Sequence, residues 1–80
     1  MKNPIITIRE KTGYNRKEFS LLLGVPYGTL SQAEYGMTEN PISILSAMSD
    51  LGLVSIEETA DAYRAWRESR RQELITGAAK

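Results

Sequence analysis

Polar but uncharged side chains gather in one short stretch, from Tyr27 to Gln32. Gln32 carries an amide that donates and accepts hydrogen bonds at once, and hydroxyl groups precede it. The stretch, here called the recognition stretch because a later resemblance assigns it that role, contains Tyr27, Gly28, Thr29, Ser31 and Gln32.

The rest of the chain lacks the residue types that most catalytic and metal sites need. It has no histidine, the commonest general base and metal ligand, and no cysteine for a disulfide or a thiolate site. It also has no glycine-rich phosphate loop of either common pattern. We therefore expect a protein that is not an enzyme and that uses no metal and no cofactor.

Residues suited to phosphate lie just ahead of the recognition stretch. Arg16 and Lys17 follow Asn15, which is predicted to begin a helix, and the amides at a helix start also bind anions. We expect Asn15, Arg16 and Lys17 to contact phosphate, although both cations could instead be simply solvated. Because the chain has ten basic and ten acidic side chains, any electropositive surface must be local.

The elements that position these residues are predicted to be helices, because apolar residues recur at helical spacing and no segment alternates as a strand does. Start signals occur at Asn3-Pro4, at Asn40-Pro41 and at Asn15 with Glu18, a capping-box pattern. One helix is expected before each of Gly13, Gly24, Gly36 and Gly52, the third from about Tyr27 to Tyr35, and a last helix from Ile56 to about Ile75. The expected apolar faces consist of Ile5, Ile8, Phe19, Leu22, Leu23, Leu30, Ala33, Ile42, Ile44, Leu45, Met48 and Leu51.

With these elements in place, the segment from Ile8 to Leu53 resembles the helix-turn-helix family of phage repressors and Cro proteins. The matching residues are Arg9, Phe19, Leu23, Gly24-Val25 at the turn, Leu30, Glu34, Gly36 and Leu51-Gly52-Leu53. The resemblance implies an all-α, five-helix lambda repressor-like bundle, with residues 1–54 as its helix-turn-helix DNA-binding core. It implies a structural ion pair between Arg9 and Glu34, with a direct phosphate contact by Arg9 as the alternative. It also implies that the third helix enters the major groove, where Tyr27, Gly28 and Gln32 read bases and Thr29 and Ser31 reach bases or phosphate.

Several features depart from the family pattern. Pro26 stands where Ser or Thr usually caps the third helix, and Gly28 lies inside that helix. Arg16 stands where the family usually has Gln. The loop that follows Gly36 is acidic, whereas family members often carry a cation there for phosphate. The alternative interpretation of the recognition stretch is an ordinary exposed polar face.

Residues 55–76 are predicted to form an amphipathic C-terminal helix beyond the family's minimal core, followed by a disordered tail over 77–80. Tyr63, Trp66 and Leu74 lie on its apolar side. This helix either folds back on the core as a fifth element or pairs with a second chain, and the two arrangements are compatible. Its arginines alternate with acidic residues, which favours a solvated face over a DNA-facing edge.

These observations predict a cytoplasmic, sequence-specific DNA-binding transcriptional regulator of the repressor or Cro type, of phage or prophage origin. It would bind a double-stranded operator as a homodimer, and no stretch is long and apolar enough for a membrane span. The alternative is a protein-binding antirepressor or modulator on the same fold. It would engage a partner repressor through the third helix or the aromatic tail, and the neutral charge and uncharged third helix favour it.

Overall fold

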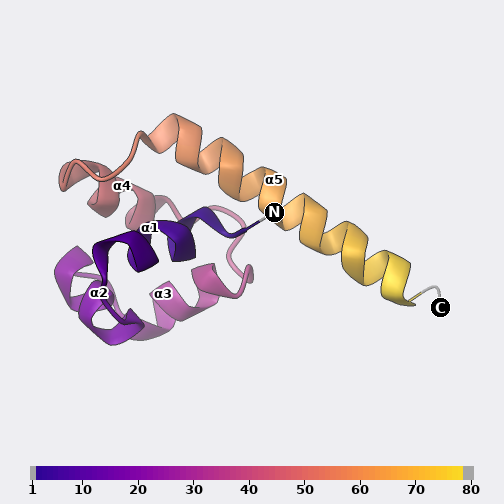
Figure 1. Cartoon of the computed structure of the whole chain (residues 1–80), viewed down its shortest axis with the longest axis horizontal. Helices are drawn as coiled ribbons and strands as arrows, with labels where there is room; N and C mark the ends of the chain where they lie inside the picture. The colour runs from indigo at the N-terminus through magenta and orange to yellow at the C-terminus, as the bar shows by residue number, and fades with distance from the viewer. Residues whose placement is uncertain (1, 79–80) are drawn as a thin grey trace.

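The chain folds into five helices and, within residues 2–78, which the computed structural model describes, no strand (Figure 1). The helices are α1 (Pro4–Thr12), α2 (Arg16–Leu23), α3 (Tyr27–Glu34), α4 (Ile42–Asp50) and α5 (Ile56–Ala78). The predicted all-α class with an extended C-terminal helix is therefore confirmed. Helix α5 includes Gly77 and Ala78, which were expected to begin a disordered tail, and residues 79–80 lie outside the described part of the chain.

Most helix ends follow the local signals of the sequence. The Asn3 side chain accepts a hydrogen bond from the Ile5 amide, and Pro4 begins α1. Gly24 ends α2 with φ +69°, and the amides of Gly24 and Val25 bond the Leu21 and Ser20 carbonyls in a Schellman arrangement. Three residues then connect α2 to α3, and the two helices pack together.

The start of α4 differs from the prediction that Asn40 caps it. Pro41 occupies the cap position with ψ 55° and offers no side-chain hydrogen bond. The chain turns there, and the Ile42 amide donates to the Asn40 carbonyl over 2.9 Å. Asn40 therefore lies one residue too early to cap the helix.

The core joins all five helices, and its buried apolar members are Ile5, Phe19, Leu23, Leu30, Ala33, Ile44, Leu45, Met48 and Tyr63. Leu22, Ile42 and Leu51 were expected on apolar faces but are exposed by 42%, 51% and 47%. In α2 the inward position belongs to Ser20 instead of Leu22. The Ser20 hydroxyl donates a hydrogen bond to the Lys17 carbonyl over 2.8 Å. Because its polar group is thereby paired, this small side chain can be buried.

The first half of α5 packs against α1 and α4, and the helix then continues past the core into open space (Figure 1). The molecule is consequently elongated, with extents of 42 × 24 × 20 Å. None of the helices in the described part of the chain is long and apolar enough to cross a membrane.

Candidate nucleic-acid interface

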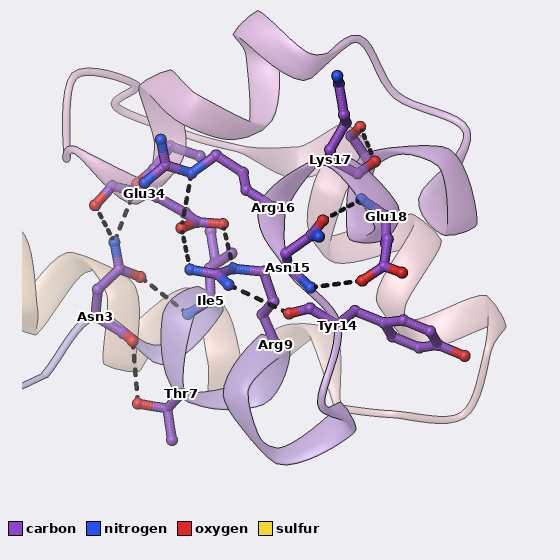
Figure 2. Close-up of polar contacts among 12 residues, drawn as sticks. Asn3, Ile5, Thr7, Arg9, Tyr14, Asn15, Arg16, Lys17, Glu18 and Glu34 are labelled. Atoms are coloured by element: carbon purple, nitrogen blue, oxygen red, sulfur yellow. Dashed lines mark hydrogen bonds and ion pairs between the residues drawn. The ribbon is translucent and has the colours of Figure 1, made fainter.

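The end of α3 is fixed by a buried carboxylate that joins three helices. The Glu34 side chain has no exposed surface and accepts bonds from Arg9 Nε and Nη2, each over 3.0 Å. The ion pair expected between Arg9 and Glu34 is therefore present, and it is bidentate. Arg16 Nε also donates to Glu34 over 3.2 Å, so α1, α2 and α3 meet at this carboxylate (Figure 2).

Arg16, expected to contact phosphate, is mainly occupied within the protein. Its Nη1 donates to the Tyr35 hydroxyl over 3.0 Å, and its guanidinium lies 4.8 Å from the centre of the Tyr35 ring. The hydrogen bond to Tyr35, followed by the charge of Glu34, raises the pKa of Arg16 above its usual value. This side chain spans α2 and the end of α3, and the sequence prediction missed that structural role.

Asn15 and Lys17 are the other two residues expected to contact phosphate. They differ in how many hydrogen-bond donors each has free for a phosphate. Asn15 forms the predicted capping box: its Oδ1 accepts from the Glu18 amide over 2.8 Å, and its amide donates to Glu18 Oε1 over 3.0 Å. Its carbonyl group and amide are thereby used, which leaves only the side-chain NH₂ to donate. Lys17 is exposed, points away from the Glu34 cluster and forms no ion pair within residues 2–78 (Figure 2).

The start of α2 also keeps backbone donors available to an anion. The amides at the first turn of a helix have no partner inside that helix. The capping box takes those of Asn15 and Glu18, whereas the amides of Arg16 and Lys17 donate to no group in the described chain. These two amides are therefore available to an anion, and the exposed Lys17 ammonium is a further donor on the same turn of α2.

Three of the five expected recognition residues lie on the exposed part of α3. Tyr27 is 50% exposed, Gln32 is exposed, and a Cβ built on Gly28 would meet nothing within 4 Å. Gly28 and Gln32 lie one turn apart and so share a face of the helix. Thr29 is half-buried, which leaves it at the margin of this face.

Ser31 does not belong to the recognition face. Its hydroxyl oxygen is buried and has no hydrogen-bond partner among the described residues. An oxygen closed off in this way cannot reach a base edge or a phosphate, so the prediction for Ser31 is corrected. The face is reduced to Tyr27, Gly28, Thr29 and Gln32.

The beginning of α3 carries no side-chain cap, as the presence of Pro26 suggested. Pro26 occupies the cap position and its carbonyl accepts from the Leu30 amide over 3.2 Å. The amides of Tyr27, Gly28 and Thr29 donate to no group within residues 2–78. The exposed end of α3 therefore presents three unpaired donors next to its recognition side chains.

The C-terminal end of α3 is held by hydrogen bonds from residues far away in the sequence. No local sequence pattern predicts these contacts. The Ala33 carbonyl accepts from Asn3 Nδ2 over 3.1 Å and from the Tyr63 hydroxyl over 3.0 Å. Asn3 Nδ2 also donates to the Glu34 carbonyl, and Arg67 Nε donates to the Gly36 carbonyl, each over 3.0 Å. Helix α3 is therefore anchored at its C-terminal end by α1 and α5, whereas the amides of its first turn remain without a partner among the described residues.

The aromatic residues of α5 are part of this anchor. Tyr63 is 1% exposed, and the Trp66 ring packs against Gly36, where an added Cβ would come within 2.7 Å of Trp66 Cη2. Of the residues expected to pack on the core or to pair between chains, Tyr63 and Trp66 thus pack on their own chain. Leu74 is 59% exposed and does not.

Comparisons with protein-family models, with curated proteins and with solved structures found no match to this chain. Its function is therefore argued from the geometry of its own residues.

Proposed function

We propose that this chain is a sequence-specific DNA-binding transcriptional regulator of the phage repressor or Cro type. One observation carries the proposal: the first turn of α3 is exposed and has no side-chain cap, while the other end of the helix is clamped by the fold. The Glu34 cluster and the hydrogen bonds to Ala33 fix the direction in which α3 points. A helix held in this way is suited to insertion into the major groove, where rigid positioning limits the entropy lost on binding.

Base recognition would rest on few side chains. Gln32 suits a bidentate contact with adenine, and Tyr27 suits a thymine methyl group or a phosphate. Gly28, which presents no side chain on the same face, lets the helix backbone approach the base edges closely. This small set predicts a short recognition sequence in each half of the operator.

Phosphate contacts would fix the position of the protein on the duplex. The Lys17 ammonium, the amides of Arg16 and Lys17, and the amides at the start of α3 supply donors for this purpose. Only one of these donors, Lys17, carries a full positive charge. The affinity should therefore fall with salt less steeply than it does for strongly basic DNA-binding proteins.

Gel-shift titrations test this proposal with duplexes taken from DNA beside the protein's own gene, across a salt series. We expect a shift at low salt that a scrambled duplex of equal composition does not compete away. If no duplex shifts in a sequence-dependent manner at low salt, the proposal is wrong.

A second function deserves a test because the exposed face of α3 carries no charged side chain and the neighbouring loop carries only Glu39. On this alternative the chain is an antirepressor or modulator that binds a partner repressor through α3. Since Tyr63 and Trp66 pack on their own chain, α3 would be the contact surface instead of the aromatic tail. Co-purification with a repressor, combined with no DNA affinity of the isolated chain, would favour this alternative.

A further inference from the structure

The outer half of α5 and the loop between α3 and α4 line an open groove of about 1320 Å³, here called the distal groove. Its helical wall lies within residues 60–75, and its loop wall lies within residues 35–42. Apolar side chains are exposed on both walls, among them Leu74 by 59% and Met37 by 75%. Neighbouring exposed apolar side chains of this kind are typical of contact surfaces.

Four arginines of α5 line the distal groove, and three of them are already paired. The pairs join each arginine to an acid three residues away on the same helix: Arg64 with Asp61, Arg70 with Glu73, and Arg71 with Glu68. Because these acids cancel the charge of their arginines, the three pairs give the groove no preference for an acidic or a basic partner.

Arg67 is the exception among the four arginines. The residues three and four positions away from it on the helix are Tyr63, Arg64, Arg70 and Arg71. None of these is acidic, so α5 offers Arg67 no counter-charge. The Arg67 side chain is half-buried, its Nε donates to the neutral Gly36 carbonyl over 3.0 Å, and it forms no ion pair within residues 2–78. A half-buried charge without a counter-charge is unfavourable, so Arg67 is a site for a carboxylate from another molecule.

The shape of the distal groove favours a helical segment over a small molecule. Small-molecule sites usually measure about 300–1,000 Å³ and enclose most of their ligand, whereas this groove is larger and lies open along α5. Leu74 lies two helical turns, about 10 Å, beyond Arg67 on the same face of the helix. The outer half of α5 has left the core at this point, so its own chain does not cover it (Figure 1).

We propose that the distal groove binds an amphipathic helix of a partner protein. A carboxylate of that helix pairs with Arg67, and apolar side chains on the same face pack against Leu74, Met37 and Ile42. This is the helix-in-groove mode of recognition, in which residues one and two turns apart act as anchors. The inference goes beyond the proposed DNA binding and does not depend on it.

A second copy and DNA are poorer occupants of the distal groove. The acids that the outer helix of a second copy would offer, Glu68 and Glu73, already pair with Arg71 and Arg70. A DNA phosphate would pair with Arg67, but it would leave the apolar walls at Leu74 and Met37 uncovered.

The first test titrates the full chain with a synthetic, tryptophan-free helical peptide. On one face the peptide carries Glu and, four and seven residues later, Leu, with Ala, Gln and Ser elsewhere. Trp66 is the only tryptophan of the chain and lines the distal groove, so its fluorescence reports occupation of the groove directly. We expect a saturable change in the Trp66 emission. No change up to the solubility limit of the peptide overturns the proposal.

Two altered peptides test the charge and the apolar face separately, with the protein unchanged. A peptide with Gln in place of Glu should bind about tenfold more weakly, because it loses a charge-assisted hydrogen bond to Arg67. A peptide of the original composition with its two Leu on opposite faces should not bind. If either altered peptide binds as tightly as the original one, the proposed mode of binding is wrong.

Leu74→Gln tests the apolar contact from the side of the protein. It should weaken binding of the original peptide about tenfold and leave the circular dichroism spectrum of the free chain unchanged, because Leu74 lies beyond the core. Leu21→Gln is the matched control, since Leu21 is 80% exposed on α2 and does not line the groove; it should bind as the wild type does. Equal binding by Leu74→Gln and the wild type contradicts the proposal.

Light scattering on the free chains identifies the competing occupant. We expect the same molar mass for the wild type and Leu74→Gln. If the wild type is dimeric and Leu74→Gln is monomeric, a second copy fills the groove and the proposal is wrong.

Discussion

At the scale of single residues, Glu34 joins three helices through its carboxylate. Its carboxylate is fully buried and balances two arginines, one from α1 and one from α2. A buried charge that loses its partners is expensive, because neither water nor another polar group replaces them. The direction of α3 thus depends on one side chain at its last residue.

Replacing Glu34 tests this role. Glu34→Gln keeps the size of the side chain but removes the charge that Arg9 and Arg16 share, and we expect it to lower the unfolding free energy by about 3 kcal/mol. Urea denaturation at neutral pH measures the change. Glu39→Gln, at an exposed site, is the control and should have almost no effect. Equal stability of the two variants would show that the cluster does not hold the fold.

Replacing Gly28 is expected to change the stability of the fold and the affinity for DNA in opposite directions. Its backbone is helical and its surroundings are open, so Gly28→Ala should raise the unfolding free energy by about 0.5–1 kcal/mol. If α3 reads DNA at close range, the same variant should bind the operator more weakly. Gly77→Ala, also helical and open, is the control and should leave DNA binding unchanged. Unaltered operator binding by Gly28→Ala would remove Gly28 from the interface.

At the scale of elements, the anchoring of α3 by α5 is the central packing feature. Tyr63 donates its hydroxyl towards the Ala33 and Thr38 carbonyls, and Trp66 lies against Gly36 in the turn after α3. The centroids of the two rings are 5.7 Å apart, so the rings also contact each other. Losing either contact should loosen the end of α3 as well as α5.

Two glycines with the same backbone geometry isolate the contact with Trp66. Gly13 and Gly36 both have φ +81°, but only Gly36 lies against another side chain. Alanine at either position incurs the cost of left-handed geometry, about 1 kcal/mol. Gly36→Ala should cost clearly more, and it should shift the tryptophan fluorescence because the Trp66 ring must move. Equal losses for Gly13→Ala and Gly36→Ala would contradict the packing described here.

The buried Tyr63 hydroxyl predicts an alkaline loss of stability. Burial raises the pKa of Tyr63 above its ordinary value of 10.0, with a smaller opposing effect of Arg67. The stabilisation is therefore complete below about pH 10 and is lost as the pH rises through the folded-state pKa. Urea midpoints should fall more steeply above pH 10 for the wild type than for Tyr63→Phe. Parallel curves for the two proteins would show that Tyr63 does not titrate with unfolding.

The helices were predictable from the sequence because their signals are local. Asn3 and Asn15 cap helices, Gly13 and Gly24 end α1 and α2, and Gly36 and Gly52 follow directly on the C-cap residues of α3 and α4. The errors arose where tertiary packing decided the outcome, as in the choice of Ser20 over Leu22 for the core. The end of α3 is contacted by Asn3, Tyr63 and Arg67, each about 30 positions away from its partner. Apolar residues at helical spacing predict helices but not such contacts between distant residues.

At the scale of the whole molecule, a neutral chain carries two separate surfaces. The exposed half of α3 is the proposed DNA contact, and the outer half of α5 exposes apolar side chains at Leu74 and Ile75. A two-fold dimer would present two α3 helices to one duplex, which predicts an operator with two-fold symmetry. Because the chain has no net positive charge, electrostatic attraction adds little to its affinity for DNA. Binding of two paired copies to one duplex would raise that affinity.

The central claim, that α3 reads DNA sequence, is tested most directly by fluorescence anisotropy with the wild type and Gln32→Ala. Both are titrated against a duplex from beside the gene and against its scrambled form, at matched low salt. The account predicts that the wild type prefers the native duplex and that Gln32→Ala loses about 1–3 kcal/mol of this preference without loss of stability. Equal binding of both duplexes by the wild type, or a preference that Gln32→Ala retains in full, would contradict it.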